Sequence, residues 1–508
     1  MSSINNRRIA KNTLLLYARQ IITLLVSLYT VRIVLEVLGI EDYGIYSVVG
    51  GVVSFFSFLS GTMASATQRF FSYALGQNDF EKLKRTFTVN WIIYGGLAVL
   101  AFLLLETIGL WFVNNSLHVP AERFEAARWV FHFSVFTFIA TIIRTPFMAI
   151  IIAYEDMQLY AYVSILEVTL KLVVVFLLVY LPWDKLEVYG VLIFFVSFLT
   201  SVAYFLICVN RYKECQFKTF YWDKELLHEI VGFTSWTLFG QLSSVFRSHG
   251  ITILLNQVFS PVVVAAKAIS TNITSQINVF SNNFNIGLYP PIIKAYAVGD
   301  KSGMFSLIYN GSKITFFLMW VFALPLFIEM EAVLNLWLKN PPLDAVLFTR
   351  LALVEVLINS VSLPLTTAAR APGKMRFYEF TLGIIQLLIF VVAWIVLKLG
   401  APAHSVFIVA IVANVIMFAV RLIIVRGLLS IKIEQYLYQV ILPVVGVAIF
   451  SAIPSFAVHY FMPSGVWFAI ITLFSSGVFS TITMYFIGLD KRLRTKISLI
   501  IISKISKQ

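Results

Sequence analysis

Six polar side chains recur every three or four residues along one stretch that lies between two apolar stretches. A helix turns about 100° per residue, so this spacing places all six on one narrow face. Amides and hydroxyls donate and accept hydrogen bonds, and a lysine adds a positive charge. The face is formed by Lys267, Thr271, Thr274, Asn278, Asn282 and Asn285.

The composition of the whole chain decides what surrounds this face. Of 508 residues, 59% are hydrophobic and 12% are charged, and the mean hydropathy is +0.88. Soluble domains carry about 25% charged residues, so the composition indicates a membrane protein. Amides are costly against hydrocarbon, which offers no hydrogen bonds. The polar face must therefore contact other helices or water, and we interpret it as one wall of a central transport cavity.

Hydropathy predicts an all-α integral membrane protein with about 14 spanning helices, because each span needs about 20 mainly apolar residues. The basic start runs into an apolar span without a cleavage site, which indicates a retained first helix. Lysine and arginine concentrate in alternate loops, which places both chain ends in the cytoplasm. The predicted spans are 13–37, 43–72, 88–113, 127–153, 159–181, 189–209, 229–257, 262–292, 307–333, 346–369, 379–399, 403–425, 440–460 and 466–487.

A weak internal repeat divides these helices. Residues 73–77 (YALGQ) match residues 296–300 (YAVGD), an offset of six helices that conserves orientation. We therefore expect two pseudo-symmetric six-helix lobes and two additional C-terminal helices. The expected parts are an N-terminal lobe at 1–209, a cytoplasmic linker at 210–228, a C-terminal lobe at 229–425, and a final part at 426–508 that ends in a basic tail.

Other predicted helices also carry polar groups at membrane depth, where each is expensive and therefore a functional candidate. Arg19 and Gln20 lie on the first helix, Gln241 and Arg247 lie on the seventh, and Arg144 lies inside the fourth. Tight helix packing could also explain small and hydroxylated faces, most of all on the second helix.

Intramembrane carboxylates receive a separate interpretation. Glu167 and Lys171 are four residues apart on one helix, so we expect a structural ion pair, with a proton or cation relay as the alternative. Glu106 and Glu355 have no obvious local partner.

Several kinds of chemistry are missing from the sequence. There is no GxxxxGK[ST] phosphate loop, no HExxH, no CxxC and no GxSxG, so no catalytic or metal residues are assigned. The two cysteines, Cys208 and Cys215, argue against a disulfide framework. The net charge of +13 is explained by cytoplasmic loops and does not require a nucleic-acid partner.

Three segments resemble the bacterial polysaccharide-biosynthesis flippases of the multidrug/oligosaccharidyl-lipid/polysaccharide (MOP) exporter superfamily. They are LGIEDYGIYS at 38–47, QRFFSYALGQND at 68–79 and its echo PPIIKAYAVGDKSG at 290–303. The resemblance implies a two-lobed, MATE-like transporter without cofactors that flips an undecaprenyl-diphosphate-linked oligosaccharide across the bacterial cytoplasmic membrane by alternating access.

The resemblance also implies roles for the polar residues and a set of partners. Basic side chains would hold the diphosphate, amides would bind sugar hydroxyls, and the two extra helices would guide the lipid tail. The candidates are Arg19, Arg247, Lys267, Arg144, Asn278, Asn282, Gln20 and Gln241. The expected partners are a lipid-linked glycan and membrane lipids around a monomer. The glycan, the coupling ion (H⁺ or Na⁺) and any partner polymerase or glycosyltransferase are left open.

Three alternatives stay open at this point. A MATE-type drug or cation antiporter would favour an acidic cavity, whereas the polar faces here carry arginine and lysine. A lipid II flippase would rescue a mutant that lacks one. A membrane enzyme acting on lipid-linked sugars would join or cleave glycans when purified.

Overall fold

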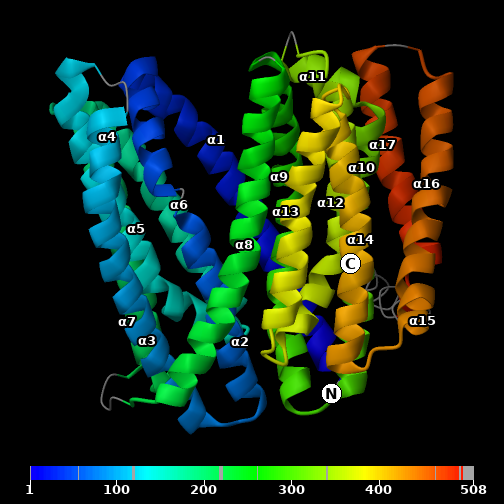
Figure 1. Cartoon of the computed structure of the whole chain (residues 1–508), viewed down its shortest axis with the longest axis horizontal. Helices are drawn as coiled ribbons and strands as arrows, with labels where there is room; N and C mark the ends of the chain where they lie inside the picture. The colour runs from blue at the N-terminus through cyan, green and yellow to red at the C-terminus, as the bar shows by residue number, and fades with distance from the viewer. Residues whose placement is uncertain are drawn as a thin grey trace, which may run out of the picture. The chain divides into compact units, whose positions relative to one another are not determined.

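The computed structural model describes residues 2–54, 56–116, 120–216, 221–259, 261–338, 341–463, 465–490 and 494–495. Every regular element in these ranges is helical, which confirms the all-α fold (Figure 1). The main helices are α1 (Ser2–Ser54), α2 (Ser57–Gly76), α3 (Phe80–Leu104), α4 (Leu110–Ser116), α5 (Phe124–Ala153), α6 (Met157–Tyr180), α7 (Lys185–Arg211), α8 (Lys224–Val258), α9 (Pro261–Ala297), α10 (Lys301–Ile328), α11 (Met330–Leu338), α12 (Ala345–Arg370), α13 (Arg376–Lys398), α14 (Ser405–Leu429), α15 (Ile433–Tyr436), α16 (Leu442–Phe461) and α17 (Val466–Thr483).

The predicted count of 14 apolar spans is not confirmed among the residues that the structure describes. Within the described residues, 11 helices are long and apolar enough to cross a membrane, or up to 12 if one bent pair forms a single span. That pair joins Glu41–Val53 to Ser57–Gly76 with a bend of 47°, after Gly39 has interrupted α1 at a φ of +78°. Two further helices, α8 and α9, have 35 and 37 residues, but their polar side chains keep them out of this apolar set.

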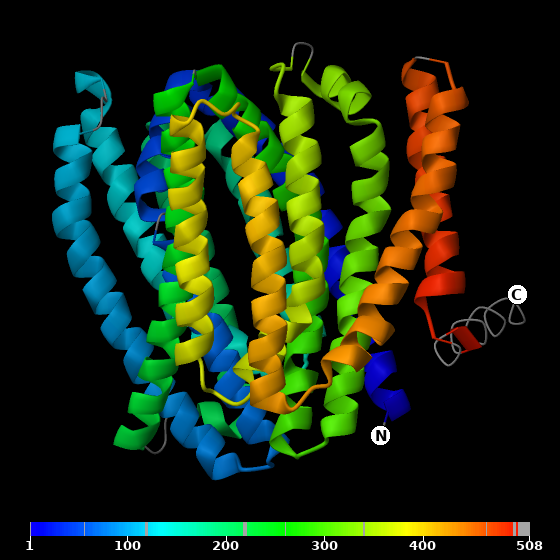
Figure 2. The ribbon, with the colours of Figure 1, turned by 45° about the vertical axis from the view of Figure 1, so that its right-hand side comes forward.

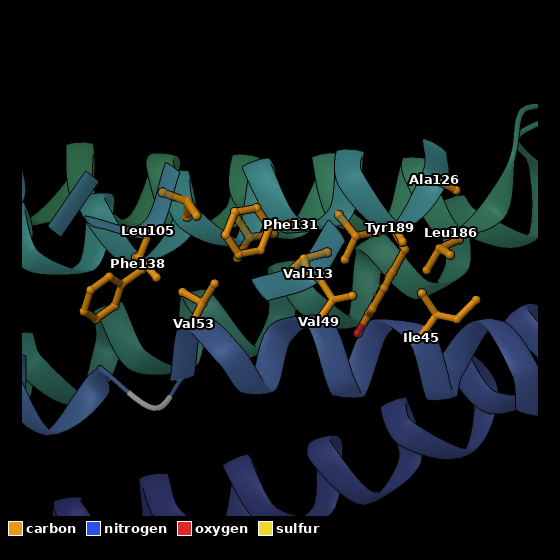
Figure 3. Packing of buried hydrophobic residues seen from close by; sticks show 14 of the residues in the cluster. Ile45, Val49, Val53, Leu105, Val113, Ala126, Phe131, Phe138, Leu186 and Tyr189 are labelled. Carbon is orange, nitrogen blue, oxygen red and sulfur yellow. The ribbon is translucent and has the colours of Figure 1, made fainter. Parts of the chain in front are cut away.

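The helices form two compact units, which we describe separately. Unit 1 comprises residues 1–238 and 293–300, and unit 2 comprises residues 239–292 and 301–508. In unit 1, α5 is the central helix and packs against α1, α2, α3, α6 and α7. A hydrophobic core lies where Ile45 and Val49 of α1 meet Phe131 of α5 and Tyr189 of α7 (Figure 3). Burial of these apolar side chains fixes α5 among its neighbours.

One end of unit 1 is held by an ionic clamp, which we call the Arg123 clamp. The Arg123 guanidinium donates to Asp42 on α1 (Nε to Oδ1, 2.8 Å) and to Asp184, the N-cap of α7 (Nη1 to Oδ2, 2.5 Å). Asp184 also accepts hydrogen bonds from the backbone N–H groups of Leu186 and Glu187. One arginine therefore joins the bend of α1 to the start of α7.

Unit 2 is built around α12, which packs against α10 and α14, while α13 packs on α14. The part of α8 that belongs to unit 2, from residue 239 onward, lies along α13. Gly240 faces Glu379 there, and Gly250 faces Phe390. A side chain at Gly250 would collide with the Phe390 ring, so the close approach of the two helices favours glycine there, whereas at Gly240 the Glu379 carboxylate would have to move. The α9 helix reaches α10 through stacked rings of Phe280 and Phe322, whose centroids are 4.6 Å apart.

The C-terminal hairpin of α16 and α17, orange and red in Figures 1 and 2, packs along α10. Three polar contacts join the hairpin region to α10. Lys313 Nζ lies 3.0 Å from Asp490 Oδ1, Trp320 Nε1 lies 2.8 Å from Ser451 Oγ, and His459 Nδ1 lies 2.6 Å from Glu329 Oε1, one residue past the end of α10. Lys313 is only 2% exposed, so its charge depends on this partner.

The two stretches of the predicted repeat end their helices with the same turn. After α2, the N–H of Asn78 donates to the carbonyl three residues earlier, and the N–H of Asp79 donates to the carbonyl five residues earlier. After α9, the N–H groups of Gly299 and Asp300 make the same two hydrogen bonds. Asn78 and Gly299 are both left-handed, with φ of 55° and 75°. These are the hydrogen bonds of the Schellman motif, so the sequence match corresponds to a shared helix ending.

Candidate substrate-binding site

The polar face of α9 begins at Lys267, near the start of the helix. The ammonium group donates to the carbonyl of Ser248 on α8 (2.9 Å) and to the hydroxyl of Thr252. Both acceptors are neutral, and α8 presents them because Ser248 and Thr252 are four residues apart on one face. The charge of Lys267 is therefore solvated by oxygen atoms of a neighbouring helix.

Next to this lysine lies a polar cluster that joins three helices of unit 2 and contains one ion pair. Arg247 Nη1 of α8 is 2.9 Å from Glu355 Oε1 of α12, and both side chains are less than one-fifth exposed. The same carboxylate oxygen accepts from the amide of Asn414 on α14 (3.1 Å), which is itself buried. Within the described part of the chain, the buried Nε of Arg247 has no hydrogen-bond partner. Most of the Arg247 charge is therefore compensated inside the bundle.

Unit 1 contains a comparable cluster around Arg144, the predicted candidate on α5. Its Nη1 donates to Glu167 of α6 (3.1 Å) and to the hydroxyl of Thr200 on α7 (3.0 Å). Lys171 lies 2.8 Å from the other oxygen of Glu167, so the expected pair of Glu167 and Lys171 is present. Two cations thus share one carboxylate at membrane depth.

Arg19 of α1 faces α6 in the same unit. Its Nη1 donates to the hydroxyl of Ser164 (3.4 Å), and the guanidinium carbon lies 4.8 Å from the ring centroid of Tyr160. A guanidinium over an aromatic face gains a cation–π interaction, which suits a charge away from bulk water. The structure therefore places Arg19 against polar and aromatic groups of α6.

The four candidate amides are solvent-accessible to different degrees. Gln241 and Asn282 are exposed, and Gln20 and Asn278 are half-buried. None of the four has a side-chain hydrogen bond with another described residue. By contrast, Asn285, the last residue of the polar face of α9, accepts a hydrogen bond from the Thr367 hydroxyl (3.4 Å). Amides without partners cannot face hydrocarbon cheaply, so these groups are available to water or to a hydroxylated ligand.

Sequence reasoning left several members of these clusters unassigned. Glu355 has no partner nearby in the sequence, because its partner Arg247 lies 108 residues away along the chain. Asn414 is the single polar residue in the stretch 406–420 of α14, and that isolation is a usable signal. Likewise, Glu106 turns out to lie 3.0 Å from His132 Nδ1 on α5. The candidate residues themselves divide between the two units: Arg19, Gln20 and Arg144 in unit 1, and the other five in unit 2.

Comparison with solved structures defines the class of fold. The chain is similar to an outward-facing multidrug-resistance MATE transporter of the MOP superfamily (TM-score 0.70, 15% identity, 84% of this chain and 96% of that one). It is similar to a MATE protein in the bent conformation (TM-score 0.71, 14% identity, 84% and 96%). A third similar structure is a MOP-superfamily transporter from Pyrococcus furiosus, described as having a binding pocket of reversed polarity (TM-score 0.63, 16% identity, 84% and 96%). The protein therefore has the fold of MATE-type transporters in the MOP superfamily.

The sequence narrows this class further. Residues 9–296, more than half of the chain, match the family described as polysaccharide biosynthesis protein. No curated protein matches the chain. The chain belongs to the polysaccharide biosynthesis protein family, and it is a multi-pass membrane protein.

Proposed function

We propose that the protein flips an undecaprenyl-diphosphate-linked oligosaccharide repeat unit across the cytoplasmic membrane for the synthesis of surface polysaccharide, such as O-antigen, capsule or exopolysaccharide. Family membership and the MATE-type fold support transport in a polysaccharide pathway. The observation that supports an anionic substrate most directly is Lys267, a half-buried lysine whose contacts in the described part of the chain are neutral oxygens.

The chemistry of the substrate explains the choice of groups. A diphosphate in a low-dielectric interior needs compensating positive charge. Lys267 provides it as a compact ammonium, and Arg19 adds a guanidinium that can meet two phosphate oxygens at once. Arg144 and Arg247 are bound to carboxylates and act mainly by setting the local field. The amides of Gln20, Gln241, Asn278 and Asn282 hydrogen-bond the sugar hydroxyls.

The proposed transport cycle uses the expected division of the chain. Lobes at 1–209 and 229–425 alternate access around the linker at 210–228, and the part at 426–508 guides the lipid tail. Both chain ends lie in the cytoplasm, and the protein acts as a monomer in the inner membrane. The helices α8 and α9 are less apolar than the other long helices. Their polar side chains suit a position beside a hydrated path better than a position against lipid.

The decisive experiment replaces Lys267 in a strain whose surface polysaccharide depends on this protein. We expect Lys267→Ala to lower surface polysaccharide at least about tenfold, because each lost charge-assisted contact is worth about 1.5–3 kcal/mol, and lipid-linked repeat units should accumulate on the inner leaflet. Lys267→Arg should retain most of the export. Lys301→Ala, at an exposed lysine of α10, is the matched control.

Normal export by Lys267→Ala at an unchanged protein level would refute the assignment of this lysine. Rescue of a strain that lacks its lipid II flippase would instead indicate the cell-wall precursor as substrate. Resistance to cationic drugs on expression would indicate an antiporter.

A further inference from the structure

A second polar site lies in unit 2 and shares no residue with the candidate substrate-binding site. A cavity of about 660 Å³ opens where the α10–α11 turn, α12 and the turn between α16 and α17 meet. Small-molecule sites in proteins commonly have volumes of about 300–1,000 Å³. In the predicted orientation, this end of the unit faces away from the cytoplasm. We propose that this cavity, which we call the Glu331 cavity, binds an amino sugar or a similar hydroxylated ammonium compound.

The charges that line the cavity favour a cation. Glu329 and Glu331 contribute two carboxylates, and Arg350 contributes one guanidinium. Two of the five Arg350 donors are committed, because Nε and Nη2 bond to the carbonyls of Phe327 and Ile328 (2.8 and 3.1 Å) at the end of α10. With one guanidinium against two carboxylates, the charged side chains of the lining carry a net negative charge, which attracts a cation.

The hydrogen-bonding groups point to the same ligand class. His459 Nδ1 lies 2.6 Å from Glu329 Oε1, so the imidazole and this carboxylate share a hydrogen bond in the cavity wall. Glu331 and Asn335 are exposed, and neither side chain has a partner among the described residues. Acceptors therefore predominate, which suits a ligand rich in O–H and N⁺–H donors.

Apolar atoms complete the lining. Phe468 and Met462 contribute an aromatic ring and a thioether beside the polar groups, and the buried Ala469 leaves room next to them. A sugar ring has apolar C–H faces and polar edges, so it matches a cavity with both kinds of wall. The two carboxylates would repel a phosphate group. The Glu331 cavity therefore differs in ligand preference from a site that holds a diphosphate.

The biological role of the site rests on the proposed function: after crossing, the sugar part of the substrate would bind here while the diphosphate stays elsewhere. The binding itself is independent of that role. This difference allows the two ideas to fail separately.

The test uses the purified full-length protein in detergent and saturation-transfer NMR with three probes: glucosamine, glucose and glucose 6-phosphate. We expect glucosamine to bind best and glucose 6-phosphate worst. Glu331→Gln should weaken glucosamine binding about tenfold, since a charge-assisted hydrogen bond is lost. Ala332→Trp, which fills the cavity from α11, should abolish binding. Glu434→Gln, at an exposed glutamate of α15, is the matched control.

The outcomes separate cleanly once unfolding temperatures show that the variants are folded. Equal binding of glucose 6-phosphate and glucosamine, or wild-type binding by both Glu331→Gln and Ala332→Trp, would overturn the Glu331 cavity as a site even if export is normal. Glucosamine binding that the two variants lose, in a protein whose deletion leaves surface polysaccharide unchanged, would uphold the site and refute the proposed function.

Discussion

The two buried charge clusters contain the same kinds of group in different proportions. In unit 1, the carboxylate of Glu167 lies between two cations, Arg144 and Lys171, at 3.1 and 2.8 Å. In unit 2, the carboxylate of Glu355 meets one cation, Arg247, at 2.9 Å and takes its second hydrogen bond from a neutral amide of α14. The first cluster therefore carries a surplus positive charge within its ion pairs, and the second is balanced.

This difference shows how the second unit keeps a cation available. Its surplus charge is Lys267, which is held by the carbonyl of Ser248 and the hydroxyl of Thr252. Neutral acceptors solvate a cation without cancelling its field, so the ammonium group can still attract an anion. A cation that shares a carboxylate attracts the same anion less.

The largest expected effect is the loss of the shared carboxylate. Glu167→Ala leaves the largely buried Arg144 next to the half-exposed Lys171 without an anion, and we expect the free energy of unfolding to fall by about 3–5 kcal/mol, mainly because Arg144 loses its partner. Glu355→Ala leaves only Arg247 uncompensated, so its loss should be smaller. Thermal unfolding of the purified proteins in detergent measures both. An equal or larger loss for Glu355→Ala would break the comparison.

The Arg123 clamp reverses the proportions, since one guanidinium there joins two carboxylates. Burial raises the pKa of Asp184. The hydrogen bonds from Arg123 and from the backbone N–H groups of Glu187 and Leu186 lower this pKa by more than burial raises it, so the pKa lies below its usual range. The group therefore stabilises the fold above the ordinary aspartate pKa of about 3.9, and this stability is lost as the pH falls through the lower folded value.

We expect Arg123→Met to reduce the free energy of unfolding by about 1–3 kcal/mol at pH 7, because a partly buried ion pair is broken. The variant should also lose less stability than the wild type when the pH falls below about 4. Unfolding temperatures between pH 7 and pH 3 give both quantities, with Asp184→Asn as the partner control. Parallel pH curves for the wild type and Arg123→Met would contradict the role of the clamp.

The neutral members of the two clusters should matter less than the carboxylates. Asn414→Leu removes the amide that donates to Glu355, and Thr200→Val removes the hydroxyl that accepts from Arg144. We expect losses of about 1–2 kcal/mol for Asn414→Leu and about 1 kcal/mol for Thr200→Val. Chemical or thermal unfolding ranks them. The reverse order would show that the amide is not part of the charge balance in unit 2.

The smallest expected effect belongs to Lys171, whose side chain is 42% exposed. Lys171→Met should change the free energy of unfolding by less than about 1 kcal/mol, because Glu167 keeps Arg144 and a half-exposed pair is screened. Unfolding temperatures with and without added salt provide the measurement. A loss comparable to that of Glu167→Ala would mean that Lys171, rather than Arg144, compensates the carboxylate.

The sequence predicted those features that depend on local spacing. Hydropathy indicated the apolar helices, and the four-residue spacing of Glu167 and Lys171 indicated their ion pair. Hydropathy also led to a count of 14 spans, because α8 and α9 are flanked by apolar residues but carry a polar face themselves. Such helices are distinguished from ordinary spans only when their surroundings are known.

Contacts between distant helices could not be predicted in the same way. Arg247 and Glu355 were both identified as buried charges, but their pairing depends on the relative axial positions of α8 and α12, which packing decides. Arg144 paired with Glu167 for the same reason. The binding roles of all eight candidate residues, including Lys267, Arg144 and Arg247, stay predictions.

The three contacts that join α10 to the C-terminal hairpin have a practical consequence for following the protein at work. Ser451 and Asp490 bind Trp320 and Lys313 of α10, and His459 binds Glu329 just past the end of that helix, so we expect the hairpin to move with α10. A fluorophore or spin label on the exposed surface of α16 would therefore report the tilt of α10, while α10 itself stays chemically unmodified.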